Sequence, residues 1–163
     1  MTNPNDAVTL RPATALDAVN IAKLIRHTLG ADRGLLRVND SKVVQYVINT
    51  IETSFVAVAD MSGRLLGSIA LTPSQQPWSD DWFMSEAWFC VKPSVHTGDT
   101  AERLLQEATA FADVQKLPLF FRVPHDDTPK SALISDRHGF NVLGAQYLRA
   151  PQRGRDAHLL KSG

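Results

Sequence analysis

Two segments near the start of the chain carry apolar residues at helical spacing. Between residues 15 and 29 these positions recur every three or four residues, and they are Ala18, Ile21, Ala22, Ile25 and Leu29. Gly30 then supplies a stop. A second helix has the apolar face Val43, Val44, Val47, Ile48 and Ile51, with Asn39 or Asp40 as its cap. A short strand at 8–11, ended by Pro12, is expected before both helices.

The pattern changes to that of extended chain in the middle of the sequence. The segment SFVAVAD (54–60) is rich in β-branched and aromatic residues, MSGR follows as a turn, and LLGSIALT (65–72) reads as the return strand. A polar loop, TPSQQPWSDD, precedes a further strand, WFMSEAWFCV (82–91), which Pro93 ends. These segments predict a hairpin followed by one more strand.

The second half predicts a long helix and then alternating elements. The helix begins near residues 97–99 and runs to about Lys116, with an apolar stripe of Leu104, Leu105, Ala108, Phe111 and Ala112. The apolar run LFFRV (119–123) is typical of a central strand. Thr128-Pro129 begins a helix that stops at Gly139, and strands are expected at 140–150 and 157–161.

The resulting order is β-α-α-β-β-β-α-β-α-β-β. It predicts an α/β chain of the α+β type, with a mixed, mostly antiparallel sheet of six to seven strands flanked by about four helices. The length of 163 residues suits a single domain over 1–163.

Composition narrows the partners and the compartment. Hydrophobic residues make up 44% of the chain and charged residues 21%, and the formal net charge is zero, so no general attraction to nucleic acid or to an anionic membrane is indicated. The start of the chain lacks a basic region followed by an apolar stretch, and no apolar run approaches the roughly 20 residues of a membrane span. The single cysteine, Cys90, excludes an internal disulfide. We therefore expect a cytoplasmic protein without a membrane segment.

Glu86 is the acidic residue of the otherwise apolar strand 82–91. Strand alternation predicts that it shares a face with Trp88 and Cys90. Burial beside apolar groups raises the pKa of a carboxyl group, which suits a general base near neutral pH. The alternative is that Glu86 faces solvent or pairs with a cation such as Arg122.

The strand–loop–helix segment from Glu86 to Leu105 and a later pair of residues carry a family resemblance. Val91-x-Pro93, a loop and Leu104-Leu105 are similar to V-x-P-x-x-R-G-x-G-x-G/A-x-x-L-L, a segment of the GNAT superfamily of acyl-CoA-dependent N-acyltransferases. Gly139-Phe140 resembles the Gly-Phe pair before the penultimate strand of that family. Together with two helices between the first and second strands, these features extend the resemblance over about residues 8–161.

The resemblance implies a fold, a co-substrate and an activity. The third and fourth strands are expected to separate near Val91, where the pantetheine arm of acetyl-CoA would pair with the backbone of Phe89, Cys90 and Val91. The pyrophosphate would lie on backbone N–H groups of Thr97, Gly98, Asp99, Thr100 and Ala101. The implied reaction is direct attack of an amine on the thioester, and the acceptor is a small-molecule or protein amine. Whether the protein forms a homodimer is left open.

The loop departs from the family pattern. His96 stands where arginine or glutamine is usual, and Thr97 and Asp99 stand where glycines are usual. An Asp99 carboxylate about 4 Å from a diphosphate would cost roughly 1–4 kcal/mol. Asp99-x-x-Glu102 also resembles a capping box, in which Asp99 would be a helix cap.

Further candidate groups follow from the resemblance and from the residues. The family's general acid, a tyrosine four residues before the Gly-Phe glycine, is replaced by Ser135, which could hydrogen-bond the leaving sulfur or be a polar residue on a helix. Trp78, Asp80, Asp81 and Trp82 suit a cationic acceptor. The histidines show no metal-ligand spacing, so no metal site is expected.

Two other hypotheses of function stay open. The fold could be kept while the altered loop no longer supports catalysis, which would make the protein a binding or regulatory module. A cysteine-dependent hydrolase using Cys90 with His96 or His125 is the third reading, set against Cys90 as a small core residue.

Overall fold

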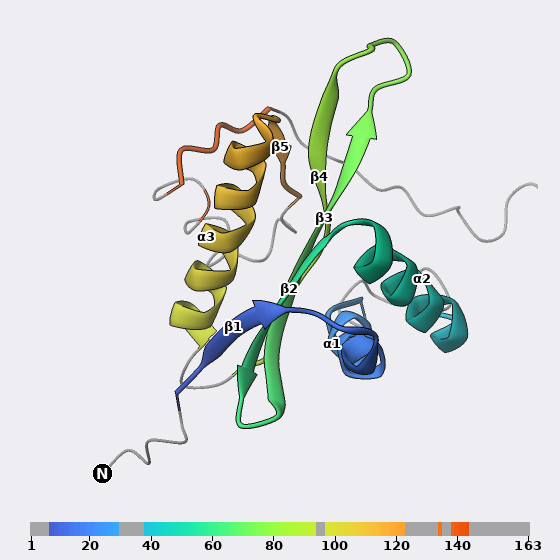
Figure 1. Ribbon diagram of the computed structural model, residues 1–163, viewed down its shortest axis with the longest axis vertical. Coiled ribbons are helices and arrows are strands. Elements are labelled where there is room, and N and C mark those ends of the chain that lie inside the picture. Colours follow the sequence, from blue (N-terminus) through green and yellow to red (C-terminus); the bar gives the residue numbers. More distant parts are fainter. Residues whose placement is uncertain (1–6, 30–37, 94–96, 123–133, 135–137, 144–163) are drawn as a thin grey trace, which may run out of the picture.

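The fold is a sheet with helices on both faces (Figure 1). The computed structural model describes residues 7–29, 38–93, 97–122, 134 and 138–143. Within these residues five strands form one sheet in the order β1-β2-β3-β4-β5. The elements are β1 (Thr9–Pro12), the 3-10 helix η2 (Ala15–Asp17), α1 (Ala18–Leu29), α2 (Asp40–Thr53), β2 (Phe55–Met61), β3 (Arg64–Gln75), β4 (Trp82–Val91), α3 (Thr97–Gln115) and β5 (Leu119–Phe120).

The sheet is mixed, as the sequence predicted. Neighbouring strands from β1 to β4 are antiparallel, whereas β5 joins β4 in parallel after the α3 crossover. Helices α1 and α2 cover one face and α3 covers the other (Figure 1). Each face buries its own apolar cluster, since alternate residues of a strand point to opposite sides of the sheet.

Most of the expected elements are confirmed in the first 120 residues. Asn39 caps α2, because its side chain accepts a hydrogen bond from the Lys42 backbone N–H at 3.1 Å. The MSGR turn has Ser62 and Gly63 at positive φ, as a tight hairpin requires. The expected total of six to seven strands and about four helices is not confirmed. The helix expected from 128 lies mainly, and the strand expected at 157–161 wholly, outside the described residues. Residues 140–143, the described part of another expected strand, are not in a strand.

Strand β3 is longer than expected, and the assignment of residues 73–75 to a loop is wrong. Pro73 lies opposite Met84 in the β3–β4 ladder. The Met84 N–H donates instead to Pro118 O at 2.8 Å, away from β3. The Pro73–Met84 pair therefore needs no N–H from proline, and the strand can continue through it.

Gly67 lets α3 approach the sheet closely. A Cβ atom at this position would lie 3.0 Å from both Cys90 O and Leu104 Cδ1, and 3.2 Å from Val91 Cγ2. Leu104 is fully buried on α3. The missing side chain thus seats the first half of α3 over the end of β4.

Gly67→Ala is expected to destabilise the protein by about 1–3 kcal/mol, because backbone and a buried leucine must move to admit one methyl group. The measurement is the free energy of unfolding in urea. Gly98→Ala is the matched control, since a Cβ there meets nothing within 4 Å and alanine favours a helix. Equal stability of Gly67→Ala and the wild type would contradict the close approach.

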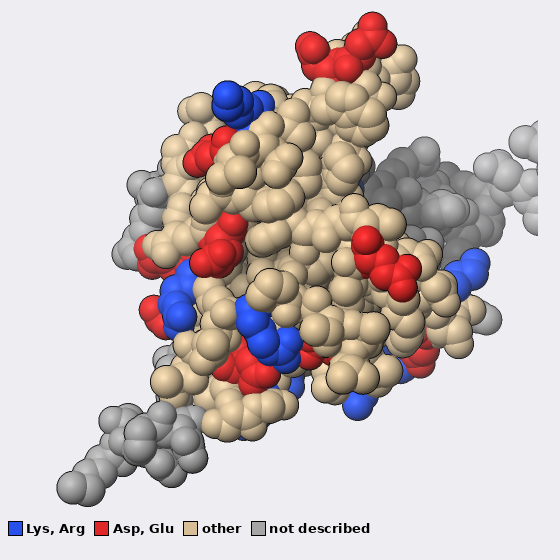
Figure 2. Space-filling model, in the orientation of Figure 1, with Lys and Arg blue, Asp and Glu red and all other residues tan. Residues whose placement is uncertain are grey.

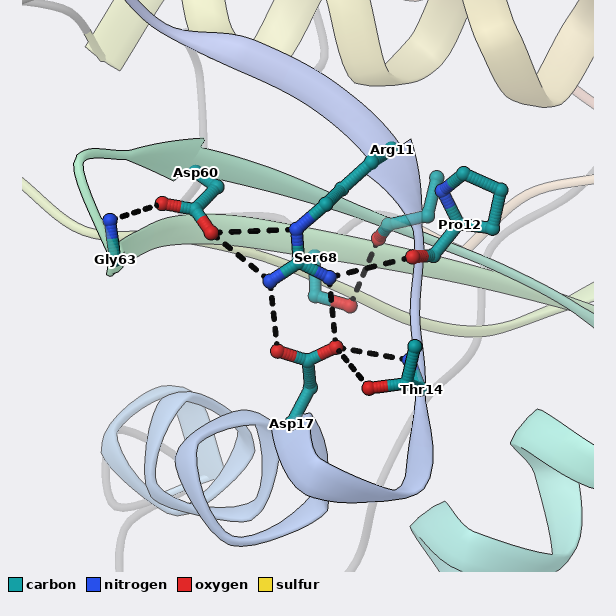
Figure 3. A network of polar contacts seen from close by, with 8 residues as sticks. Arg11, Pro12, Thr14, Asp17, Asp60, Gly63 and Ser68 are labelled. Carbon is teal, nitrogen blue, oxygen red and sulfur yellow. Dashed lines mark hydrogen bonds and ion pairs between the residues drawn. The ribbon is translucent and has the colours of Figure 1, made fainter.

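A half-buried arginine, Arg11, joins β1 to η2 and β2 (Figure 3). Arg11 donates from Nη1 and Nη2 to the two carboxylate oxygens of Asp17, at 2.8 and 2.9 Å, and from Nη2 and Nε to Asp60 Oδ2, at 2.9 and 3.2 Å. Asp17 also accepts from the Thr14 backbone N–H at 2.8 Å, and Asp60 accepts from the Gly63 N–H at 2.7 Å. One guanidinium therefore fixes the edge strand, the start of the first helix and the β2–β3 turn.

The Arg11 hydrogen bonds lower the pKa of Asp17 to about 2, with help from the Thr14 N–H and against the effect of burial. A carboxyl group with a lowered pKa stabilises the fold above its unfolded pKa of about 3.9, and this stabilisation is lost as the pH falls toward 2. Asp17→Asn is therefore expected to cost about 2 kcal/mol at pH 7 and much less at pH 2.

Urea midpoints measured from pH 2 to pH 7 test this pH dependence. The control is Asp40→Asn, which removes the exposed ion pair with Arg26 and is expected to cost below about 1 kcal/mol. Stability curves for Asp17→Asn and wild type that run parallel over the whole pH range would contradict the assignment.

Candidate functional site

A β-bulge interrupts the middle of β4. Trp88 lies opposite Ala70 and Glu86 lies opposite Leu71, so Ala87 is an extra residue without a partner on β3. A bulge bends its strand and increases the local twist. It therefore divides β4 into a first half near the β3–β4 turn and a second half that leads into α3.

The bulge also changes which backbone groups face β5. Before it, the Met84 N–H donates toward β5, to Pro118 O. After it, the Lys92 N–H donates to Leu66 O of β3 at 2.7 Å. Because successive residues of a strand direct their backbone groups to opposite sides, Phe89 and Val91 direct theirs toward the β5 side.

The separation of the third and fourth strands that the resemblance implies is wrong for this chain. Strands β3 and β4 stay paired from Gln75–Trp82 to Gly67–Val91. By contrast, β4 pairs with β5 only at Met84–Leu119 and Ser85–Phe120. Residues 121 and 122 follow β5 outside any strand. The described β4–β5 ladder thus ends before the bulge.

Aromatic side chains pack beside the second half of β4. The Phe89 ring is buried and meets the Phe121 ring edge-on, with centroids 5.7 Å apart. Phe121 in turn meets Phe140 at 5.9 Å. Gly139, at a φ of +70°, precedes Phe140, so the Gly-Phe pair noted in the sequence places a ring in this apolar layer on the α3 side.

Glu86 lies at the bulge, on a different face from the one expected. It is half-buried and lies opposite Leu71, which belongs to the core under α3. Trp88 and Cys90 pack on the α1 and α2 side. The expectation that all three share a face is wrong, because the extra residue shifts the alternation by one position.

Helix α3 is the next element after β4 and begins at Thr97. Thr97 is the first helical residue and Asp99 the third, so the interpretation of Asp99 as the helix cap is wrong. The Asp99 side chain is 67% exposed and lies 3.9 Å from Arg103 Nη1, which donates to Val8 O at 2.8 Å. Next to Asp99, the space above Gly98 is open. This turn therefore combines accessible backbone with one exposed carboxylate.

Several of the expected binding residues can offer only their backbone. The side chains of Phe89, Cys90, Thr100 and Ala101 are buried, and Val91 is half-buried. Thr100 Oγ1 makes no hydrogen bond in the described part of the chain. Burial of Cys90 among core residues of the α1 and α2 face supports its reading as a packing residue. His96, His125 and Ser135 lie outside the described residues.

A buried hydrogen-bond chain supports the opposite face of this junction. Trp88 Nε1 donates to Ser68 Oγ at 3.0 Å, and Ser68 Oγ donates to Ala57 O at 3.0 Å. The chain crosses β4, β3 and β2 just after the bulge. Sequence reasoning missed Ser68, although a serine in an apolar strand is itself a signal that a buried polar partner is near.

The acidic and aromatic residues expected at an acceptor site lie at the far end of β4. Trp78 is 81% exposed and Trp82 is 52% exposed, on the hairpin that projects beyond the sheet in Figure 1. Asp80 and Asp81 are exposed beside them.

No helix in the described segments has the length and apolar character needed to cross a membrane.

Comparison with solved structures identifies the fold. A predicted acetyltransferase from Clostridium acetobutylicum, in a crystal structure with acetyl-CoA, matches with a TM-score of 0.69 and 12% identity over 88% of this chain and 96% of that one. An aminoglycoside acetyltransferase from an uncultured soil metagenomic sample has a TM-score of 0.67 and 14% identity over 89% and 97% of the two chains. The ribosomal-protein-alanine N-acetyltransferase of Brucella melitensis biovar Abortus 2308 has a TM-score of 0.65 and 15% identity over 88% and 99%.

Searches with protein-family models and against curated proteins give no match. The structural matches nevertheless agree with one another and cover most of each chain. The protein has the fold of the GNAT acetyltransferases, as its sequence predicted.

Proposed function

We propose that the protein is an N-acetyltransferase that transfers the acetyl group of acetyl-CoA to an amine. The observation that carries the proposal is the end of β4–β5 pairing at Ser85, immediately before the bulge at Ala87. Backbone groups of Phe89 and Val91 are directed toward the β5 side, beyond the last described β4–β5 pair. The pantetheine arm would lie along this side of β4.

The start of α3 would hold the charged end of the co-substrate. Backbone N–H groups from Thr97 to Ala101 lie in the first turn, where helices bind phosphate. His96, just before the helix, would add positive charge when protonated. The apolar layer of Phe89 and Phe121 suits the alkyl part of the arm.

Glu86 would take the proton of the acceptor amine. The amine nitrogen forms a bond to the thioester carbonyl carbon, the carbon–sulfur bond breaks, and the amine proton passes to the Glu86 carboxylate, directly or through water. Ser135 would hydrogen-bond the departing sulfur. Backbone near Val91 would polarise the carbonyl oxygen, as other oxyanion-binding groups do.

The class of amine accepted is a further part of the proposal. Structural relatives act on quite different acceptors, since one is an aminoglycoside acetyltransferase and another a ribosomal-protein-alanine N-acetyltransferase. Trp78, Asp80 and Asp81 offer charge and aromatic faces to a cation. A small-molecule or protein amine with positive charge fits these groups.

The direct test is calorimetry with acetyl-CoA, followed by an acetyl-transfer assay with aminoglycosides and with basic peptides. Saturable binding together with transfer is expected. The absence of both binding heat and a thermal shift at millimolar acetyl-CoA would defeat the proposal.

Asp99→Asn is expected to raise the affinity for acetyl-CoA about three- to tenfold, because it removes a carboxylate from the turn that meets the diphosphate. The increase should shrink in high salt, since Asp99 is exposed. Asp113→Asn, at the other end of α3, is the matched control and should leave the affinity unchanged. Acetyl-pantetheine, which lacks the diphosphate, should bind Asp99→Asn and the wild type with equal affinity. A higher affinity of Asp99→Asn for this shortened ligand would contradict the explanation.

A second candidate function is a GNAT-fold binding or regulatory module without catalysis. The exposed Asp99 carboxylate at the phosphate-binding turn favours it. In that case Asp99→Asn would restore acetyl-CoA binding to a protein that otherwise lacks it. Acetyl transfer by the wild-type protein would exclude this alternative.

A further inference from the structure

A cavity of about 600 Å³ opens at the β1 edge of the sheet, away from the proposed acetyl-CoA site. It forms because β1 pairs with β2 only at residues 57–60 and leaves the sheet after Pro12. Phe55, at the start of β2, therefore lies beyond the last β1 pair. The cavity occupies the space between this uncovered strand end and the second half of α3.

The interior of the cavity is apolar. Its floor and walls include Leu10, Pro12, Phe55, Met84, Phe111 and Leu117. Phe55 and Phe111 stack with their ring centroids 4.6 Å apart. A ligand with an aryl or alkyl body would find both the volume and the surface that small-molecule sites usually have.

Two carboxylates lie at the edge of this apolar interior. Glu52 at the end of α2 and Glu107 on α3 are exposed lining residues. In Figure 2, which looks onto the β1 edge, acidic groups lie over α3 and near the end of α2, with uncharged surface between them. The last turn of α2, residues 51–53, also lines the cavity and presents the negative end of its helix dipole.

The cationic residue among the lining residues does not offset this charge. Arg11 is bound by two carboxylates, Asp17 and Asp60, so this group of three carries a net negative charge. Among the lining residues that the structure describes there is neither lysine nor histidine. Charge complementarity therefore selects a cation and disfavours an anion such as a nucleotide.

We propose that this cavity binds an organic cation, an ammonium group attached to an aryl or alkyl body. The apolar body packs on Phe55 and Phe111, and the ammonium group lies between Glu52 and Glu107, where carboxylates and ring faces attract it. The site is separate from the proposed diphosphate-binding turn, because its α3 residues lie one half-helix beyond that turn. Roughly 15 Å separates Phe111 from Ala101 along the helix, at 1.5 Å per residue.

Benzyltrimethylammonium is a suitable probe because its quaternary nitrogen has no proton and cannot be acylated. Its binding therefore does not depend on acetyl transfer. In an NMR titration of the full chain we expect saturable shifts at Phe55, Phe111 and their neighbours, with a dissociation constant of about millimolar for so small a ligand. Benzyl alcohol and phenylacetate, the neutral and anionic comparison ligands, should bind more weakly.

Charge-removing variants separate specific from adventitious binding. Glu52→Gln and Glu107→Gln should each weaken binding of the probe about two- to fivefold, and the double variant about tenfold. Asp113→Asn, an exposed carboxylate of α3 outside the cavity lining, is the control and should have no effect.

Several outcomes would overturn the proposal. They are equal binding of the three ligands, an unchanged affinity in the double variant, shifts located elsewhere, and no saturation below about 20 mM. A concentration-dependent dimer that protects this face in sedimentation and NMR would also overturn it, because the occupant would then be a second copy of the chain. A protein that does not bind acetyl-CoA could still bind the probe in this cavity. The experiments therefore distinguish failure of this proposal from failure of the proposed function.

Discussion

Replacing Glu86 by glutamine is expected to lower kcat for acetyl transfer by about 10²–10⁴-fold, the usual contribution of a general base. The amide is close in size to the carboxylate but cannot accept the amine proton. The affinity for acetyl-CoA should change little, because the proposed contacts to the co-substrate come from backbone beyond the bulge. Steady-state kinetics and calorimetry on the same preparations would measure both quantities.

The pH profile separates a base from a structural residue. In the wild type, kcat/KM should fall at low pH as Glu86 becomes protonated, and this limb should disappear in Glu86→Gln. Asp113→Asn is the matched control, since it removes an exposed carboxylate far from the junction. A variant with wild-type kcat and an unchanged acid limb would show that Glu86 has no role in proton transfer.

Deleting Ala87 is expected to abolish acetyl-CoA binding, a loss greater than about tenfold, while the protein still folds. Removing the extra residue leaves Glu86 opposite Leu71 and Trp88 opposite Ala70, so every other side chain keeps its face of the sheet. The backbone groups of Met84, Glu86, Phe89 and Val91 would then form one regular edge. Strand β5 could pair along that edge and close the position of the pantetheine arm.

Ala87→Ser is the matched control for the deletion, because it changes the side chain and retains the extra residue. It should bind acetyl-CoA as the wild type does. Circular dichroism and urea unfolding would establish that the deletion variant is folded, with a stability within about 2 kcal/mol of the wild type. Undiminished acetyl-CoA binding by the folded deletion variant would remove the bulge from the explanation of the site.

Local patterns were sufficient for most of the elements in the first part of the chain. The apolar spacing of α1 and α2, the Asn39 cap and the Ser62-Gly63 turn depend on residues within a few positions of one another. Strand β4 was predicted with its observed bounds, because Pro93 and the preceding polar loop mark its ends. The extension of β3 through Pro73 was missed, since it depends on the partner strand rather than on proline itself.

The bulge and the start of α3 lie in segments that the sequence analysis singled out, but their geometry was not predicted. Residues 86–91 and 97–101 do surround the bulge and the start of α3. The face of Glu86 and the pair of strands that separate were both wrong. The face of Glu86 was wrong because a single extra residue in β4 cannot be recognised until its register with β3 is known. The pair of strands was wrong because pairing between strands depends on contacts between distant segments.

Over the first 120 residues the sequence by itself determined the helices, most of the strand bounds and the turn chemistry, because these depend on short-range periodicity and on the conformational limits of proline and glycine. The order of these elements is what indicated a GNAT fold. Only the tertiary structure decided the bulge at Ala87, the short β4–β5 ladder, the half-buried Arg11 network and the cavity beside Phe55. These features arise from contacts between residues far apart in the chain, such as Arg11 with Asp60 and Phe55 with Phe111. Register and packing between distant segments depend on the whole set of buried contacts, which no single stretch of sequence contains.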